Sequence, residues 1–435
     1  MSKAYSPAFC RSCAKELVYH KSLMETAIPG LLIVAGKFLF QEYTAAQVSS
    51  VIGRICRVAG MAALGAVTTC GDIRALCLSL VLFYFWGQSQ SRFEAGRKAF
   101  YFFLGATWIL PEGIVTFFEG VSLRLPMALF IWITACFFLS VPFGALFRHQ
   151  GWQRAFAVPL IFVSLTIPPL GVFCVVPPLI AAGVVFPGLG WWGVAGSIGV
   201  AAALSSHKRA WAIIPPIVAT ALFAKPISTP THSHKIEAIN TSFAFETGDV
   251  RPTAEWQRAK EVAQHPLQKE RFVALLPESI GGQITGAGWR LWDGVRQKIG
   301  ARALIIGGER GFATHRENAL FLVEARASAP LPVYTQRVPV PFSMGKPWAG
   351  AQSYPMSLSR KGTFLLDGTP IGALICYEAL LSAPVLYTMS ERPEQLVVAG
   401  NLWWAKRTHL HQIVEAFSQS WARLFGVPVV VSLNR

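Results

Sequence analysis

The sequence predicts a polytopic α-helical membrane domain in residues 1–225, followed by an α/β domain in residues 226–435. The composition is the first indication, because 53% of the residues are hydrophobic and 14% are charged, with a mean hydropathy of +0.43. Such a chain is too apolar for an ordinary soluble protein. The second indication is that long apolar runs end near residue 225. The third is that short β-rich runs alternate with helical stretches beyond that point.

The apolar runs of the first domain predict six to eight membrane-spanning helices. Several runs reach the roughly 20 residues that a spanning helix needs. Two proline pairs, at 168–169 and 177–178, interrupt the longest run and predict a kinked span with a re-entrant piece. Residues 58–70 and 23–40 are shorter or interrupted candidates. The clearest runs are residues 75–90, 99–118, 125–147, 155–184, 189–206 and 210–224.

Basic residues gather in short clusters between these runs. The formal net charge is +16, but the cations do not form one arm or helix, so we expect no direct binding of nucleic acid. Such loops are typical of the cytoplasmic side of a polytopic protein. We therefore expect a multi-pass protein of the bacterial inner membrane, with residues 226–435 in the periplasm. The clusters are Arg92, Arg97 and Lys98; Arg148 and Arg154; and Lys208 and Arg209.

The cysteines are distributed unevenly between the two domains. Seven of the eight lie in the first half, mostly in or beside apolar runs, where a free cysteine packs as a small hydrophobic side chain. The second domain has only Cys376 and so cannot hold a disulfide of its own. Cys10 and Cys13 have the spacing of metal ligands, but no second pair accompanies them, and we interpret them as structural or incidental. We expect no metal and no cofactor.

The second domain predicts a layered α/β structure. Continuous apolar runs that alternate with helical stretches indicate strands covered on both faces. Two helices are expected at residues 254–264 and 409–425, and a helical stretch follows Cys376. The β-rich runs are "IEAINTSFAF", "RFVALLPES", "ARALIIGG", "NALFLVEAR", "IGALICYE", "QLVVAGN" and "VPVVVSLN".

Two reactive side chains stand at the ends of predicted strands. Glu278 ends "RFVALLPES", and Cys376 ends "IGALICYE" before a helical stretch. A thiol at a strand-to-helix junction has backbone N–H donors nearby, which favour a thiolate and an oxyanion. A carboxylate beside it could accept its proton. Each motif alone is more typical of a core cysteine or a solvated turn, whereas the two together favour a site that pairs a nucleophile with a general base.

Several segments resemble a known group of enzymes. "LLPES", "ICYE" and "GNLWWA" resemble segments of the nitrilase, or carbon-nitrogen hydrolase, superfamily. The membrane domain ahead of them, including "RKAFYFFLGATWILPEGIVTFFEG", is similar to that of apolipoprotein N-acyltransferase. The conjugal-transfer TraB family of bacterial plasmids shares this architecture, and the resemblance covers nearly the whole chain. It implies a nitrilase-like sandwich of four layers, α-β-β-α, for the second domain.

The resemblance also implies a Glu-Lys-Cys catalytic set. Glu278 matches the base, Cys376 the nucleophile, and Glu378 an acidic residue found just after that cysteine. Leu402 replaces an aspartate that is usual in the family segment. The residues expected to contact substrate are Tyr334, Tyr377, Asn401 and Trp403.

The match fails at the catalytic lysine. In "VYTQRVPVPFSM", Gln336 occupies the lysine position and supplies a hydrogen-bond donor but no charge. Arg337 is the neighbouring cation, but on a regular strand it would face the other way. Only an irregular backbone near Pro339 would bring Arg337 into the site. A second acidic residue expected in this segment is replaced by Met344.

Two hypotheses for the function follow. The first is a membrane-bound, thiol-dependent N-acyltransferase or amidase that serves plasmid conjugal transfer, with a membrane lipid as acyl donor. Glu278 and Cys376 favour it. The alternative is an inactive nitrilase-like scaffold that binds proteins of the conjugation apparatus, which the loss of the lysine favours. A transporter is less well supported, because Glu112 is the main charge within the apolar runs.

Overall fold

The computed structural model describes residues 58–223, 236–243, 252–265, 272–284, 286–325, 331–346 and 348–435. The described residues, from Val58 onward, form one compact unit. The domain boundary expected at 225/226 lies outside the described residues. So do the apolar candidate at 23–40 and the pair Cys10 and Cys13.

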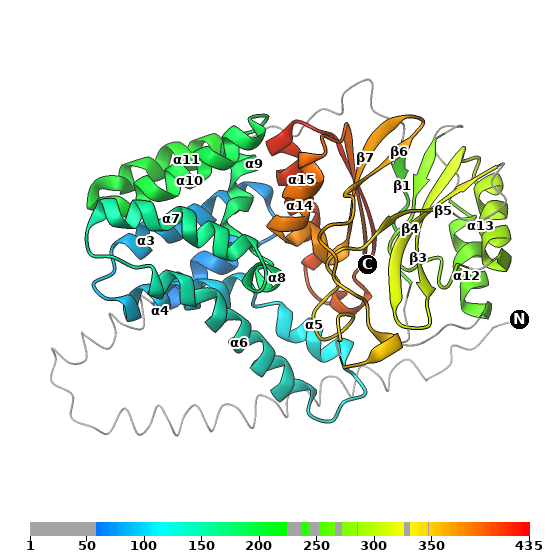
Figure 1. Cartoon of the computed structure of the whole chain (residues 1–435), viewed down its shortest axis with the longest axis horizontal. Helices are drawn as coiled ribbons and strands as arrows, with labels where there is room; N and C mark the ends of the chain where they lie inside the picture. The colour runs from blue at the N-terminus through cyan, green and yellow to red at the C-terminus, as the bar shows by residue number, and fades with distance from the viewer. Residues whose placement is uncertain are drawn as a thin grey trace, which may run out of the picture. The chain divides into compact units, whose positions relative to one another are not determined.

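Helices occupy each of the six clearest apolar runs (Figure 1). The run at 155–184 is broken as expected, since α7 ends at Thr166 and the next long helix begins only at Gly190. The run at 99–118 is also broken, at a turn that follows Ala106. The elements are η1 (Ile73–Leu80), α3 (Val81–Gly87), α4 (Arg92–Ala106), α5 (Leu110–Phe117), α6 (Arg124–Ala145), α7 (Gly151–Thr166), α8 (Leu170–Phe173), η2 (Pro178–Ala181), α9 (Ala182–Val185), α10 (Gly190–Ser206), η3 (Lys208–Ile213) and α11 (Ile214–Leu222).

One helix in the described part of the chain, α6, is long and apolar enough to cross a membrane by itself. Two bent pairs of elements pass the same test together: α4 with α5, bent by 56°, and the η2–α9 segment with α10, bent by 118°. If each pair is one span, the described residues hold up to three spans. The six to eight spans expected from the sequence stay a prediction.

The α/β part contains two sheets. The first has the order β1-β2-β3-β4-β5, with β1 to β3 parallel and β3 to β5 antiparallel. The second has the order β6-β7-β8-β9, with β7 to β9 parallel. The strands are β1 (Ile236–Ala238), β2 (Val273–Leu275), β3 (Ala303–Gly311), β4 (Arg316–Glu324), β5 (Leu331–Thr335), β6 (Thr363–Leu366), β7 (Thr369–Ile375), β8 (Gln395–Asn401) and β9 (Val429–Asn434).

The side chains on the two faces of the first sheet pack into two different hydrophobic cores. Leu304 and Ile306 of β3 pack with Trp292 in the core beneath the outer helices. Ala303 and Ile305 point the other way, into the core shared with the second sheet. Figure 1 shows the outer helices α12 and α13 on one side and α14 and α15 on the other, so the layers run helix, sheet, sheet, helix. These helices are α12 (Pro252–Val262), α13 (Gly286–Lys298), α14 (Ser382–Ser390) and α15 (Leu410–Phe425).

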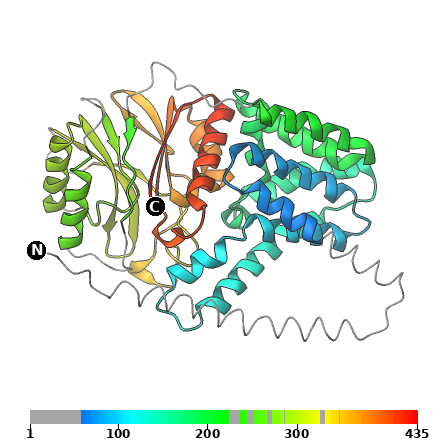
Figure 2. The same ribbon diagram turned by 180° about the vertical axis from the view of Figure 1, so that it is seen from behind.

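Helix α15 lies between the second sheet and the helical part, as both views show (Figures 1 and 2). Its buried Phe417 and Trp421 belong to a core that continues into the helical part. On that side the Ser420 hydroxyl donates to the carbonyl of Ile180, with Oγ and O 2.6 Å apart. Gly426 ends the helix with φ +69°, a value that glycine adopts at little cost, and the chain then enters β9. The site-bearing sheet is thereby fixed to the helical part.

Candidate active site

Cys376 stands where β7 ends and the short helix η5 (Cys376–Leu380) begins. Its φ of +50° lies in the left-handed region, which residues other than glycine seldom adopt. The chain therefore turns sharply at the thiol, and the side chain is left at the strand end with 8% of its surface exposed. Burial raises the pKa of the thiol, and the nearby backbone N–H groups of Asn401 and Tyr377 act in the opposite direction. These donors lie where negative charge on sulfur would develop.

Glu278 meets this thiol from the loop after β2. Its carboxyl group lies next to the Cys376 side chain, and each of the two groups shifts the pKa of the other. Asn318 Nδ2 donates to Oε1 at 2.6 Å, and the Asn401 backbone N–H donates to Oε2 at 3.0 Å. Glu278 is 5% exposed. The structure thus brings together the two side chains that the sequence predicted to meet.

The electrostatics of the pair suit proton transfer near neutral pH. Burial raises the pKa of Glu278 to about 7, against the lowering effect of its hydrogen bonds. Burial, and then the charge of Glu278, raise the pKa of Cys376 well above its usual value. The resting site therefore holds a thiol beside a carboxyl group whose pKa is matched to a general base.

Gln336 lies immediately after β5 and is 4% exposed. Its Oε1 accepts from Asn318 Nδ2 at 3.0 Å, and its Nε2 donates to the carbonyl of Ile375 at a long 3.4 Å. The neutral amide therefore lies next to the residue that precedes Cys376, and its amide N–H is only weakly engaged.

The Glu378 carboxylate connects the end of β7 with the end of β5 and the segment that follows it. Its carboxylate accepts from the Tyr334 hydroxyl at 2.6 Å and from the backbone N–H groups of Arg337, Val338 and Ile375 at 2.7, 3.1 and 2.9 Å. It is fully buried, and burial raises its pKa against these bonds. A carboxylate occupied in this way holds the segment after β5 against the end of β7. The role of Glu378 at the site stays a prediction, and its four hydrogen bonds favour positioning of these two segments.

Arg337 points into α14. Its Nη2 donates to Pro384 O at 2.8 Å and to Thr388 Oγ1 at 2.6 Å, and its Nε donates to the Tyr334 hydroxyl at 3.2 Å. Nε also lies 3.9 Å from the Glu378 carboxylate, and the side chain is fully buried. The side chain therefore faces away from Gln336, as expected for its neighbour on a strand, while Nη1 is buried without a hydrogen-bond partner.

The four residues expected to contact substrate have different surroundings. Tyr334 is 3% exposed and its hydroxyl is taken by Glu378. The Tyr377 hydroxyl donates to the Val172 carbonyl of α8 and ties the turn at the thiol to the helical part. Asn401 serves the site through its backbone, while its Oδ1 accepts from Asn434 Nδ2 at 2.8 Å.

Trp403 begins the short helix η6 (Trp403–Ala405), which follows β8. Its ring is half-buried and lies 6.1 Å from the ring of Phe117 in α5. Trp403 therefore packs against the helical part through Phe117.

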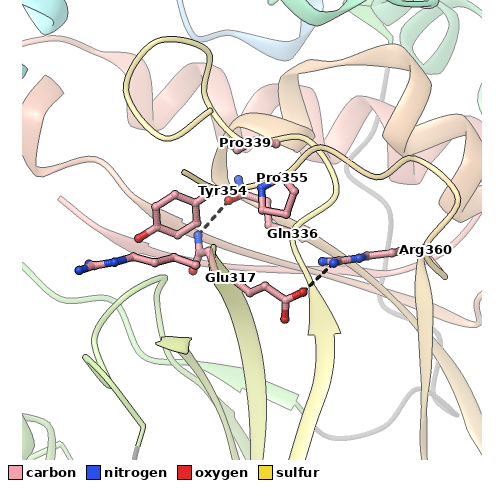
Figure 3. A pocket seen from close by; sticks show the side chains of 8 residues that line it. Glu317, Gln336, Pro339, Tyr354, Pro355 and Arg360 are labelled. Atoms are coloured by element: carbon pink, nitrogen blue, oxygen red, sulfur yellow. Dashed lines mark hydrogen bonds and ion pairs between the residues drawn. The ribbon is translucent and has the colours of Figure 1, made fainter. Parts of the chain in front are cut away.

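Asn318 of β4 is a residue that the sequence reasoning missed. It bonds both Glu278 and Gln336, it is 1% exposed, and its Oδ1 has no hydrogen-bond partner. The available signal was a polar residue at the start of the apolar run "NALFLVEAR". A cavity of about 10 Å³, roughly one water molecule in size, adjoins this amide pair (Figure 3). It is lined by Arg316, Glu317, Asn318, Gln336, Pro339, Tyr354, Pro355 and Arg360.

The chain is 30% identical over 398 residues to the conjugal transfer protein TraB of Agrobacterium fabrum, across 86% of this chain and 90% of that protein. The chain belongs to the TraB family of conjugal transfer proteins. A TraB protein of Sinorhizobium fredii, described as a probable conjugal transfer protein, is 28% identical over 388 residues, or 85% of this chain and 95% of the relative. The prediction of the TraB family is confirmed. No family model matches the chain.

Solved structures similar to this TraB-family chain belong to the nitrilase group. An amidase of the nitrilase superfamily from Nesterenkonia is 13% identical, with a TM-score of 0.35 over 47% of this chain and 78% of the amidase. A carbon-nitrogen hydrolase from Helicobacter pylori is 10% identical, with a TM-score of 0.31 over 46% of this chain and 73% of the hydrolase.

Proposed function

We propose that this protein is a membrane-bound cysteine enzyme of plasmid conjugation that moves an acyl group from an amide or ester onto an amine or water. The observation that carries the proposal is that the Glu278 carboxyl group, held by Asn318 Nδ2 and the Asn401 backbone N–H, lies next to the Cys376 thiol. A nucleophile, a base with a pKa of about 7 and backbone donors beside the sulfur are the minimum set for covalent acyl transfer.

The first half of the reaction forms a thioester. Cys376 Sγ attacks the carbonyl carbon of the donor while its proton passes to Glu278. The intermediate collapses when Glu278 returns that proton to the leaving amine or alkoxide, so that the carbon–nitrogen or carbon–oxygen bond breaks. The acyl group remains on sulfur and Glu278 is again ionised.

The second half releases the acyl group. An amine or a water molecule attacks the thioester and gives its proton to Glu278, and that proton returns to sulfur as the carbon–sulfur bond breaks. An amine makes the protein an N-acyltransferase, whereas water makes it a hydrolase.

The oxyanion in both halves would be held by neutral donors. The Tyr377 backbone N–H and the weakly engaged Gln336 amide are the groups in place. A charged lysine at position 336 would stabilise the oxyanion further, by about 2 to 4 kcal/mol at a typical donor position. We expect a slow enzyme on this ground.

The arrangement of basic loops supports a periplasmic α/β part. The start of α7 meets the end of α10, where Arg154 Nε donates to Ser205 O at 2.8 Å. The end of α6 meets the start of α4, since a Cβ at Gly144 would lie 3.2 Å from Arg92 O. The three basic clusters therefore share one end of the helical part. At the other end of α10, the Trp191 ring lies 5.5 Å from Phe425 of α15. Positive charge favours the cytoplasm, so the α/β part would face the opposite side.

Exposed apolar side chains support several crossings by the helical part. Two of its helices carry continuous outward rows of them, which in water would form a large unfavourable patch. A lipid surface is the environment that fits them, and a membrane lipid is then the nearest acyl donor. The exposed residues are Leu125, Leu129, Phe130, Ile133, Phe137, Phe138 and Val141 in α6, and Trp152, Phe156, Leu160 and Val163 in α7.

The second candidate is an inactive scaffold that binds proteins of the conjugation apparatus. The observations that favour it are the neutral Gln336 at the lysine position and the engagement of Arg337 Nη2 with α14. A thiol without a nearby free cation would then be a remnant of an enzyme.

Intact-mass measurement separates the two candidates. Purified protein in phospholipid vesicles is expected to gain the mass of an acyl chain at Cys376, and the gain should be lost in Cys376→Ser and in Glu278→Gln. Cys70→Ser is the matched control, because Cys70 is an exposed free cysteine outside the α/β part. Acylation that persists in Cys376→Ser but vanishes in Cys70→Ser would refute the enzyme.

A further inference from the structure

A second carboxylate faces the same site from β3. Glu309 is paired with Asn318 across β3 and β4, and residues directly opposite each other project from the same face of a sheet. Asn318 bonds Glu278 from that face. Gly307, two residues before Glu309, lies against the Glu278 backbone, since a Cβ there would be 2.5 Å from the Glu278 Cα. Glu309 and Glu278 are therefore neighbours between the two sheets.

Burial raises the pKa of Glu309, and two neighbouring groups oppose this effect and favour its charged form. Arg316 Nη1 of β4 lies 3.7 Å from its Oε2, and the Tyr354 hydroxyl donates to its carboxylate. Arg316 and Tyr354 also line the cavity beside Gln336. Glu309 is further anchored by its backbone, whose N–H donates to Gly282 O at 2.8 Å.

The other charged groups around Glu309 lie on its flanks. Near Gly282, Arg258 and Glu255 of α12 approach the same turn. Arg310, the next residue along β3, projects from the opposite face and pairs with Glu317. On the inner face, the ionisable groups near Glu309 are therefore Arg316, Tyr354 and Glu278.

We propose that Glu309 is a positioning residue that makes Glu278 a stronger proton acceptor for Cys376. This inference rests on the proposed function. The sequence has Met344 at the position where a second acidic residue was expected, and Glu309 of β3 would supply a second carboxylate from a different element. Two nearby carboxylates disfavour simultaneous ionisation, and the charge of Glu309 accordingly adds to burial in raising the pKa of Glu278. A base with higher proton affinity removes the thiol proton more readily.

The test follows the alkylation of Cys376 by iodoacetamide against pH, read by intact mass on the full chain in detergent. This readout needs no acyl substrate. In the wild-type protein the rate should rise as Glu278 ionises, with a midpoint near its pKa of about 7. Glu309→Gln is expected to move that midpoint to lower pH by about half a unit or more. Glu309→Asp should keep it near the wild-type value.

Two further variants keep the test decisive if Glu309→Gln does not fold. Arg316→Gln removes a positive charge from the pair and should move the midpoint to higher pH. Glu324→Gln, at the far end of β4, is the matched control and should leave it unchanged. An unchanged midpoint in Glu309→Gln or Arg316→Gln, or an equal shift in Glu324→Gln, would overturn the inference. A profile that Glu278→Gln leaves unaltered would instead refute the base of the proposed function.

Discussion

The Glu278 carboxyl group lies next to the Cys376 thiol between the two sheets of the α/β part. Glu278 follows β2 of the first sheet, and Cys376 follows β7 of the second. The contact exists because both strands end at the same edge of the sandwich. The site therefore depends on how the two sheets pack, and substitutions that alter this packing should act on it even when they touch neither residue.

The pH profile of acylation should follow Glu278. Its pKa of about 7 predicts an acid limb with a midpoint near that value, because only the ionised carboxylate accepts the thiol proton. Initial rates of thioester formation across this range check it. A profile that stays flat through the acid limb would contradict the assignment of Glu278 as base.

The contribution of Glu278 to stability should fall as pH rises, whereas the acylation rate should rise. The pKa of Glu278 is raised by folding from a model value of 4.5, so the folded state favours the protonated carboxyl group. Its contribution is present at low pH and is lost as pH rises through about 7. Thermal unfolding of the wild type and Glu278→Gln should show that their difference grows with pH in this window. A constant difference would argue against a buried, neutral Glu278.

Arg337→Ala should lower the stability of the fold, and we expect no direct effect on the reacting atoms. Its guanidinium is fully buried and is held by Thr388, Tyr334 and the Pro384 carbonyl. Removing one partner of such a buried network, which includes Glu378, costs about 3 to 5 kcal/mol. A lower unfolding temperature in detergent is the expected result. A variant with wild-type stability and no acylation would show instead that Arg337 acts at the reacting atoms.

Gln336→Lys should preserve or raise the rate of acylation. A cation at this position would lie beside the residue that precedes Cys376 and would add to the stabilisation of the oxyanion by up to about 2 to 4 kcal/mol. The rate of thioester formation measures the effect, with Gln336→Met as the control that removes the donor. A rate in Gln336→Lys below that of Gln336→Met would contradict the role given to this side chain.

The membrane orientation has its own test. A reporter that is active only in the cytoplasm, fused after Arg435, should be silent, and the same reporter in the loop at Lys208 should be active. The reason is that the basic clusters share one end of the helical part and the α/β part lies at the other. A strong signal after Arg435 would invert the proposed topology.

The sequence predicted most of the fold because its strongest signals are local. Long apolar runs became helices, and prolines broke the longest one where expected. The helices expected at 254–264 and 409–425 correspond to α12 and α15. The strands β5 and β6 were not predicted, since β5 contains a proline and β6 is a short strand at a sheet edge. Helix α13 was also not predicted. It begins with "GAG", which is unfavourable for a helix, although Trp292 and Val295 further along are buried.

The nucleophile and the base were predictable from the residues because both lie at or shortly after strand ends. These are Cys376 and Glu278, and strand ends are where functional groups of α/β proteins collect. Asn318 and Glu309 lie within antiparallel strands and reach the site through the register of β3 with β4. The register of this hairpin is set partly by the turn between Gly311 and Arg316, which was not predicted from the sequence. The alternation of side chains along a strand did indicate that Arg337 would face away from Gln336.

The central claim is that thiol chemistry at Cys376 serves plasmid transfer. The most direct measurement is the transfer frequency of a plasmid that carries Cys376→Ser, compared with the wild type at equal protein level and with Cys70→Ser as the control. The account predicts that Cys376→Ser reduces transfer by about 100-fold or more, as expected for loss of a covalent nucleophile, while Cys70→Ser transfers normally. Wild-type transfer by a folded Cys376→Ser protein would contradict the account and favour the scaffold.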